Sequence, residues 1–508
     1  MSTASDFPRT GSASGTVSQT LRARLPQVRE HYRLHPLVVI YLITVMVPLW
    51  FHLGPLNMNI QRSFLLVMFI PLLIKFLSGQ AGRFIASDYL FFFVLIWFPI
   101  SLSQTSPSQA ISFSGSVGME FIGGYLIGRL YIRSRESFLA LCRWLVLIIL
   151  CLLPLALVET LTNRPPLIEF LNRLPAPFRG VSVVQYPQRM GFYRAQTVFA
   201  HPILSGLFCS IGFSLCYIAL KDVYSTTRRL VSSALVFLVG FLALSSGALL
   251  ALFLQLALIG WAAMFRKVQA RWWLLVGLFV LLYIVIDIIS TRTPLRVFMS
   301  YATFSAHNAF WRSIIFEWGM MNIFGSAENG IPAARLFGIG FNDWVRPHFM
   351  PSSSVDNYWL AITMRNGVPA GLANMFGYGL IVMALMRCKL DDCPKLIHIR
   401  RAMVFTFLGL AFTLCTVHIW TQVYSFVHFM LGASVWLLDP KVQERYRVDA
   451  SPEAESTTQS AAELAGAQSR HLPHTRFQHR PMRRDAQPLS TRQPISQKGA
   501  SDVVQVPR

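Results

Sequence analysis

The sequence predicts an all-α membrane protein with about twelve transmembrane helices, and three observations lead to this fold class. Of its 508 residues, 54% are hydrophobic and only 13% are charged. Its apolar runs repeatedly reach the roughly 18 to 20 residues that a helix needs to cross a bilayer. The lysines lie in or next to alternate connections between these runs and in the C-terminal segment, which is the pattern of a protein that crosses a membrane many times.

Twelve apolar runs are the predicted spans. Their approximate limits are 37–54, 60–78, 86–103, 110–131, 138–159, 198–220, 230–246, 247–265, 272–290, 357–386, 401–419 and 421–438. If the N-terminus starts in the cytoplasm, the connections that contain Arg133, Lys221, Lys267 and Lys389 all lie inside, as the positive-inside rule requires. The same orientation keeps all seven lysines on or near the inner side. We therefore expect both termini in the cytoplasm.

The two ends of the chain differ from the apolar middle. Residues 1–36 are polar and basic and lack the apolar core of a cleavable signal. Residues 439–508 are rich in Gln, Ser, Pro, Arg and His. Neither segment contains enough apolar surface to offset the entropy lost on folding. We expect mobile cytoplasmic tails at 1–36 and 439–508, and a transmembrane domain at 37–438.

Two long connections, 160–197 and 291–356, fall on the predicted outer side. The second lies between the ninth and tenth spans, has 66 residues and contains no lysine. Its many Phe and Trp residues favour a folded surface over a solvated linker. Apolar residues at helical spacing predict a short helix near Trp311–Ile323, and Gly338 and Gly340 predict a turn.

Three arginines in these connections, Arg189, Arg194 and Arg312, lie beside aromatic and apolar residues rather than in charge runs. A guanidinium is always charged and offers a planar fork of donors, so it suits phosphate or pyrophosphate oxygens. The alternative is that these side chains only contact lipid headgroups.

A carboxylate, Asp356, directly precedes the tenth predicted span and is followed by Asn357. Asp356 could act as a catalytic base or cap the helix, and capping is the commoner role of Asp at this position. Arg365 lies two to three turns farther along. A cation inside a span is costly unless it is paired or faces a cavity, so Arg365 should face protein or ligand.

Other ionisable residues in or beside spans are compatible with a polar cavity, a proton path or pairing between helices, and pairing is favoured. They are Glu120, Glu159, Asp287, His418 and His428. The chain has no P-loop, dinucleotide fingerprint, zinc signature or nucleophile elbow, so we expect no nucleotide, cofactor or metal. Juxtamembrane cations more often contact lipid headgroups than nucleic acid.

Three short motifs resemble those of the O-antigen ligase and polymerase-like family of bacterial envelope glycan enzymes. They are Arg189-Met190-Gly191-Phe192 followed by Phe199-Ala200-His201-Pro202; Trp311-Arg312 ahead of Leu336-Phe337-Gly338-Ile339-Gly340; and Asp356-Asn357, nine residues, then Gly367. The resemblance covers roughly residues 37–438. Two positions depart from the family pattern: Asp356 stands where its ligases place histidine, and Ser245-Ser246-Gly247 stands where many members have arginine before glycine.

The resemblance implies a metal-independent glycosyltransferase of the bacterial inner membrane, which polymerises sugar repeats carried on polyprenyl pyrophosphate at the periplasmic face. It implies that Asp356, Arg312 and Arg365 are catalytic. It assigns substrate binding to Arg189, Arg194, His201, Trp311 and Asn357. Membrane lipids, a chain-length regulator and a flippase are the implied partners.

Three alternatives remain. One is a ligase that moves finished glycan to a lipid or protein acceptor. Another is a polysaccharide flippase or secondary transporter, although transporters concentrate polar groups near the bilayer midplane rather than in outer loops. The third is a scaffold for envelope assembly.

Overall fold

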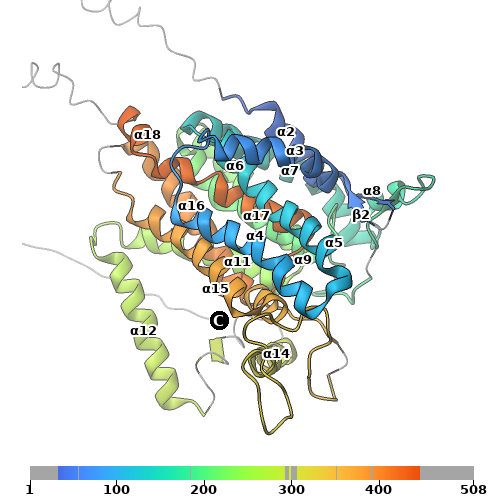
Figure 1. The fold of residues 1–508 in the computed structure, drawn as a ribbon. Helices are drawn as coiled ribbons and strands as arrows, with labels where there is room; N and C mark the ends of the chain where they lie inside the picture. The colour runs from blue at the N-terminus through green and yellow to red at the C-terminus, as the bar shows by residue number, and fades with distance from the viewer. Residues whose placement is uncertain are drawn as a thin grey trace, which may run out of the picture. The chain divides into compact units, whose positions relative to one another are not determined.

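The computed structural model describes residues 32–446, apart from 55, 184, 292, 293, 295, 296, 299–305, 351, 391 and 392. This part of the chain is mostly helical, with three short strands (Figure 1). The elements are α2 Pro36–Met46, β1 Leu49–Leu53, β2 Leu56–Asn59, α3 Ile60–Leu77, α4 Ala86–Thr105, α5 Pro107–Gly118, η1 Met119–Gly123, α6 Gly124–Tyr131, α7 Arg135–Thr162, α8 Pro166–Leu171, β3 Arg179–Gly180, α9 Pro202–Tyr217, η2 Ala219–Asp222, α10 Thr226–Leu242, α11 Ser246–Met264, α12 Arg271–Ile289, α14 Ala306–Phe324, α15 Tyr358–Arg387, α16 Pro394–Leu414, α17 Thr421–Gly432, η3 Val435–Leu438 and α18 Pro440–Arg445.

Each of the twelve apolar ranges predicted from the sequence contains a helix. Counted over the described residues, ten helical segments are long and apolar enough to cross a membrane. The two remaining ranges hold α2, with 11 residues, and α10, with 17.

The first predicted span, 37–54, is wrong in its second half. α2 ends at Met46, and residues 49–53 form strand β1, which pairs with β2 in an antiparallel hairpin. Pro48 lacks an N–H and biases the preceding residue toward extended backbone, and Val47 has φ −91° and ψ 105°. A helix of 11 residues is about 16 Å long, roughly half the thickness of a bilayer core.

The predicted tails, 1–36 and 439–508, each include described residues next to the transmembrane domain, 32–36 and 439–446. The segment predicted as a tail from residue 439 starts with α18, and the Tyr446 hydroxyl that follows donates a 2.7 Å hydrogen bond to Glu136 near the start of α7. The remaining parts of both tails, 1–31 and 447–508, lie outside the described residues.

Two glycines allow α6 and α17 to pack closely. Gly124 and Gly128 face the main-chain carbonyl oxygens of Ser425 and Phe429, and a Cβ atom at either glycine would collide with them. Small residues four positions apart commonly let membrane helices approach one another. This interface brings η1, the π-helical turn before α6, against the start of α17, where Tyr424 lies.

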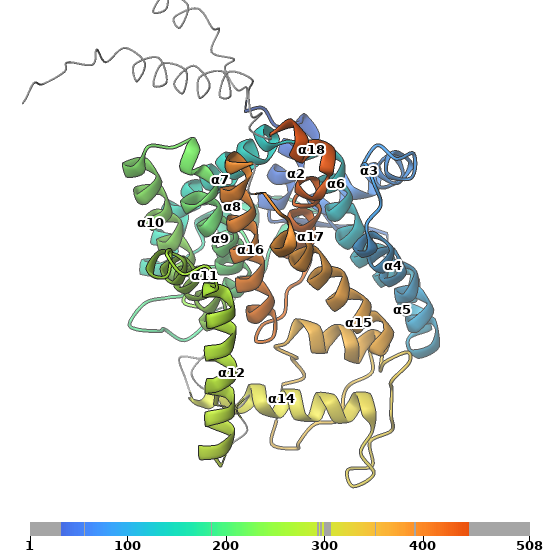
Figure 2. The same ribbon diagram turned by 90° about the vertical axis from the view of Figure 1, so that its left-hand side faces the viewer.

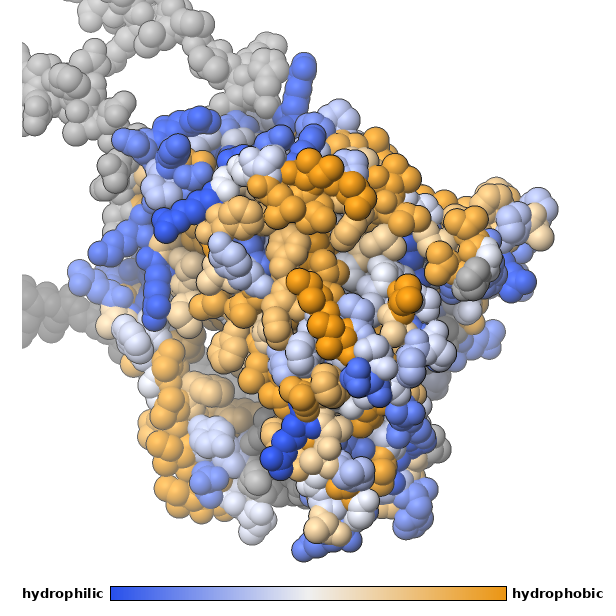
Figure 3. Space-filling model, in the orientation of Figure 1, coloured by the Kyte–Doolittle hydropathy of each residue, from blue (hydrophilic) through white to orange (hydrophobic). Residues whose placement is uncertain are grey.

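Large apolar side chains cover parts of the outer surface. On α3, Val67, Ile70 and Ile74 are each more than half exposed, and α12 has no buried residue. Figure 3 shows apolar side chains gathered over the middle of the face on which α3 and α4 lie. Surfaces of this kind are unfavourable in water and suit contact with lipid. Together with the ten long apolar helices, they indicate a multi-pass membrane protein.

The predicted outer stretch 291–356 contains α14, which includes the helix expected at Trp311–Ile323. Figure 2 shows α14 running crosswise to α12. α14 packs on α15 through a small apolar core that contains Ile315, Leu360 and Trp344. This stretch is therefore folded over its described residues. We refer below to the end of the helices formed by 163–201, 325–357 and 415–420 as the loop end.

Candidate functional site

A break in α15 sets the backbone around Arg365. Gly367 has φ 82° and ψ 170°, a conformation that glycine alone adopts readily. The predicted turn at Gly338 and Gly340 is present, and both glycines have positive φ. This turn docks on the break: the amides of Ile339 and Gly340 donate hydrogen bonds of 2.7 and 3.0 Å to carbonyl oxygens just before it, the second to Arg365 itself. Two motifs that are distant in sequence thus meet at one point.

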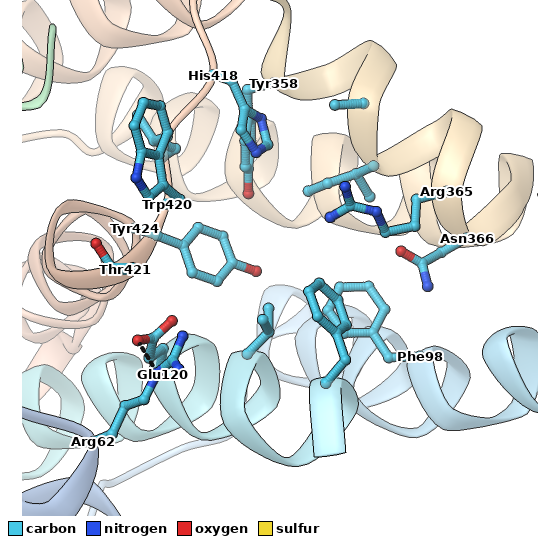
Figure 4. A pocket seen from close by; sticks show the side chains of 15 residues that line it. Arg62, Phe98, Glu120, Tyr358, Arg365, Asn366, His418, Trp420, Thr421 and Tyr424 are labelled. Carbon is cyan, nitrogen blue, oxygen red and sulfur yellow. Dashed lines mark hydrogen bonds and ion pairs between the residues drawn. The ribbon is translucent and has the colours of Figure 1, made fainter. Parts of the chain in front are cut away.

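The Arg365 side chain lines a cavity of about 140 Å³ at the loop end. Its guanidinium lies 5.2 Å from the ring centre of Phe113 and 4.9 Å from that of Phe341, in cation–π contacts. Figure 4 shows Arg365 and Tyr424 pointing into the cavity from different walls. Arg365, expected to face protein or ligand, contacts aromatic side chains of the protein and lines this cavity.

A buried ion pair forms part of the wall near Tyr424. Arg62 Nε lies 2.7 Å from Glu120 Oε1, and the Glu120 side chain is 1% exposed. The sequence predicts a pairing partner for Glu120, and the structure identifies it as Arg62. Glu120 belongs to the π-helical turn η1, and such turns are frequent at functional sites. Tyr358 and Trp420 add aromatic surface to the same cavity.

The two predicted binding arginines of the loop 160–197 lie near each other at the loop end. Arg189 donates a 2.8 Å hydrogen bond to a main-chain carbonyl between α10 and α11. The Arg194 guanidinium lies 4.7 Å from the ring centre of Tyr186. Burial, and secondly the neighbouring charge of Arg189, lower the pKa of Arg194 to about 10. The structure thus places two cations close enough to repel each other.

His201 connects these arginines to the cavity. Its Nδ1 accepts a 3.0 Å hydrogen bond from the first turn of α9, so the imidazole caps that helix. Its ring lies 5.7 Å from Trp420, which stacks 6.0 Å from His418. Burial, reinforced by Arg194 and by the second loop arginine, lowers the pKa of His201 to about 4. Burial and then the charge of Arg365 lower the pKa of His418 to the same value.

Arg312, on α14, lies within electrostatic reach of both Asp356 and Arg189. Burial lowers the pKa of Arg312, Asp356 opposes this shift and Arg189 adds to it. Asp356 is partly buried and accepts a 2.9 Å hydrogen bond from the Ser354 hydroxyl, and it does not line the cavity around Arg365. The neighbouring Trp311 packs against the apolar core between α14 and α15.

The helix cap at the start of α15 is Asn357. Its Oδ1 accepts a 3.0 Å hydrogen bond from the amide of Leu360. The capping role proposed for Asp356 is therefore taken by its neighbour. Asn357, predicted to bind substrate, has a structural role at this position.

The four predicted arginines share one property, the lack of a neutralising carboxylate within the described ranges: Arg194 and Arg312 lie within electrostatic reach of Arg189, and Arg365 faces the cavity. In the described part of the chain, none of the four has a carboxylate oxygen within 4 Å. Buried Arg194 Nε, Arg312 Nη1 and His418 Nδ1 also have no hydrogen-bond partner among residues 32–446. Leaving such groups unsatisfied typically costs about 1–3 kcal/mol each, so the site is suited to an anion that accepts several hydrogen bonds.

The sequence favours pairing between helices for Glu159 and His428, but both side chains bond to main-chain groups instead. Glu159 accepts hydrogen bonds of 2.9 and 2.8 Å from the amides of Gln196 and Thr197, which anchors the loop that carries Arg194. His428 Nδ1 lies 2.8 Å from the main-chain carbonyl oxygen of the residue four positions earlier. Asp287 lies exposed on α12.

Several cavity residues are not predicted from the sequence. Arg62 comes from α3, and Trp420 and Tyr424 come from the start of α17, and no local pattern marks them. One feature of the sequence could have indicated that Glu120 faces α17. Glu120 lies four residues before Gly124, the first glycine of the close α6–α17 interface, and therefore on the same helix face.

The fold and the site define a class, a multi-pass helical membrane protein with a cavity lined by arginine and aromatic side chains at one end of its helices. Comparison of the chain with protein-family models and with curated proteins found no match. Over the described residues, no group of three or more His, Cys, Asp or Glu side chains is placed to hold a metal ion.

Proposed function

We propose that this protein is a metal-independent glycosyltransferase of the bacterial inner membrane that polymerises sugar repeats carried on polyprenyl pyrophosphate at the periplasmic face. The observation that carries the proposal is that Arg194 and Arg312 both lie within electrostatic reach of Arg189, while none of the three, nor Arg365 at the cavity, has a carboxylate partner in the described residues. A pyrophosphate brings several negative oxygens to such cations, and guanidinium groups bind them in a fixed geometry. The twelve-span topology with both termini in the cytoplasm belongs to this proposal.

The leaving group explains why fixed cations would accelerate this reaction. The acceptor hydroxyl attacks the anomeric carbon of the donor sugar, the bond from that carbon to the phosphate oxygen breaks, and its electrons pass to the pyrophosphate. Arg312, Arg189 and Arg194 stabilise the developing charge with little reorganisation, because protein contacts already hold them. Arg365 holds the donor from the cavity side.

Asp356 is the proposed base that takes the proton of the acceptor hydroxyl. It is partly buried and lies within electrostatic reach of Arg312. Because Asn357 caps α15, Asp356 is not needed as the helix cap. The cavity beside Arg365 offers a subsite for a sugar, because Tyr358, Trp420 and Tyr424 provide aromatic faces. The Arg62–Glu120 pair supplies polar groups at the same cavity.

The test is the length distribution of polymer made in cells that carry single variants. We expect Arg312→Lys, which keeps the charge and loses the planar fork, to reduce polymer formation roughly 10- to 100-fold. Asp356→Asn and Arg365→Ala should leave single repeats on the carrier. The matched control is Arg173→Lys, because Arg173 is an exposed arginine of the same loop as Arg189. Full-length polymer from all three site variants, at normal protein levels, would remove the site assignment.

A ligase remains the second candidate because the same arginines would serve any donor on a polyprenyl pyrophosphate. The accumulated carrier-linked species separates the two: single repeats in an Arg312 variant indicate a polymerase, and long chains indicate a ligase. Sugar-chain elongation by the purified protein in vesicles, without translocation, would argue against a flippase. A scaffold would be unaffected by substitution of Arg312 or Asp356. A chain-length regulator and a flippase are the partners that a polymerase would need.

A further inference from the structure

A second cavity, of about 310 Å³, lies between α7 and α10 at the end of the bundle opposite the loop end. It lies along the first half of α7, which starts at Arg135 and carries Arg143, and beside the first turn of α10, which starts at Thr226 and carries Arg228. Its lining also includes Trp144 and Tyr224. None of these residues takes part in the proposed transfer reaction.

The two arginines of this cavity contact aromatic rings but have no carboxylate partner among the described residues. Arg228 lies 4.1 Å from the ring centre of Tyr224, and Arg143 lies 5.6 Å from that of Tyr32. Within the described ranges, neither guanidinium has a carboxylate oxygen within 4 Å. Asp222, near the same helix ends, is already paired with Arg135 at 3.7 Å. Two guanidinium groups therefore remain to bind an anion.

Below Arg143, the cavity continues along an apolar stripe of α7. Val146, Leu147 and Leu150 line it, and they lie three, four and seven residues after Arg143, so they share its helix face. Leu147 is 53% exposed. The cavity thus combines a cationic, aromatic head with an apolar stem that runs into the depth of the helices.

We infer that this cavity is a binding site for an anionic phospholipid. The phosphate lies between Arg143 and Arg228, and an acyl chain follows Val146, Leu147 and Leu150. Arginine forks match phosphate oxygens, and Trp and Tyr side chains favour the level of the lipid headgroups. Charge complementarity selects an anionic phospholipid over a zwitterionic one. Basic pockets between membrane helices commonly bind anionic headgroups.

The experiment uses full-length protein in phosphatidylcholine vesicles that contain a phosphatidylglycerol with a photoreactive diazirine in one acyl chain. After irradiation, mass spectrometry locates the labelled peptides. We expect labelling within residues 143–150. Two cations at about 1 kcal/mol each predict a roughly 30-fold loss of specific labelling in Arg143→Ala/Arg228→Ala. The control, Arg266→Ala/Arg387→Ala, removes two exposed cations from the same end and should label as the unmodified protein does.

A further variant keeps the proposal testable if the double alanine protein fails to insert. Arg228→Glu places a carboxylate in the first turn of α10, which the helix dipole tolerates, and should abolish labelling at 143–150. Equal labelling in this variant overturns the inference. Equal labelling by a photoreactive phosphatidylcholine, or displacement by excess inorganic phosphate, also overturns it, because the site would then be a non-selective groove or a soluble-phosphate site. If residues 1–31 occupied the cavity instead, the unmodified protein would not be labelled at 143–150, and this result would also overturn the inference.

Discussion

Replacing Gly367 with alanine should disrupt the docking of the Gly338–Gly340 turn on α15, which fixes the backbone at Arg365. The residue has φ 82° and ψ 170°, and a Cβ atom there would collide with the carbonyl oxygen of Leu336. The substitution therefore forces the turn at Gly338–Gly340 away from α15. It also separates the amides of Ile339 and Gly340 from their acceptors.

The magnitude follows from these parts. A side chain in this region of φ and ψ costs about 1–3 kcal/mol. Two lost hydrogen bonds add about 1 kcal/mol each. We expect Gly367→Ala to reduce the free energy of unfolding by about 3–5 kcal/mol in total.

Gly379→Ala is the matched control because it lies in the same helix and a Cβ atom there would meet nothing within 4 Å. Alanine at an open helical position should stabilise by roughly 0.5–1 kcal/mol. Thermal unfolding of the two purified variants measures the difference, and amide hydrogen exchange at Ile339, Gly340 and Val368 reports the local contact. If Gly367→Ala matched the control in both measurements, the docking of the turn on the α15 break would be refuted.

Three further predictions concern the helix interface, the histidines and the α15 cap. Gly128→Ala should destabilise the protein by several kcal/mol relative to Gly115→Ala, measured by thermal unfolding, because only the first Cβ would collide with a main-chain carbonyl. Unfolding returns the pKa of His201 and His418 from about 4 to about 6.5, so unfolding takes up protons and stability should fall as pH drops from 6.5 toward 4. His418→Gln should flatten this dependence of the melting temperature on pH, and an unchanged slope would contradict it. Asn357→Ala should lower the free energy of unfolding by about 1 kcal/mol through the lost cap, without the larger loss of polymer expected for Arg312→Lys.

The helices could be predicted from sequence because hydropathy and spacing are local properties. All twelve apolar ranges contain helix, and the spacing at Trp311–Ile323 led correctly to α14. The first range was misjudged because apolar composition cannot separate a helix from the hairpin formed by β1 and β2. The strand Arg179–Gly180 pairs with β1 although the two strands are separated by more than 120 residues in the sequence. No local sequence pattern indicates such a pairing.

The sequence indicated which arginines are candidates for the site, but it did not indicate how the residues around them are arranged. Arginines beside aromatic residues correctly indicated partly buried cations, because a guanidinium next to apolar neighbours is rarely fully solvated. The sequence could not show that Asn357, rather than Asp356, caps α15, since both residue types are good caps. It also could not show that Arg62 pairs with Glu120, because that contact joins two helices 58 residues apart.

Contacts between segments that are distant in sequence hold the arginines of the site in position, so any activity of the site depends on those contacts. Arg312 is held by the packing of α14 on α15, and Arg365 is held by the turn that docks at Gly367. Both contacts involve the stretch between α14 and α15, so one folded unit positions cations from two helices. A substitution that loosens this unit would weaken both cations together, whereas a substitution of one guanidinium would leave the other in place. We therefore expect the double variant Gly367→Ala/Arg312→Lys to show a smaller loss of transition-state stabilisation than the sum of the two single losses. The glycine substitution already displaces the folded stretch that holds Arg312, so the second substitution has less to remove.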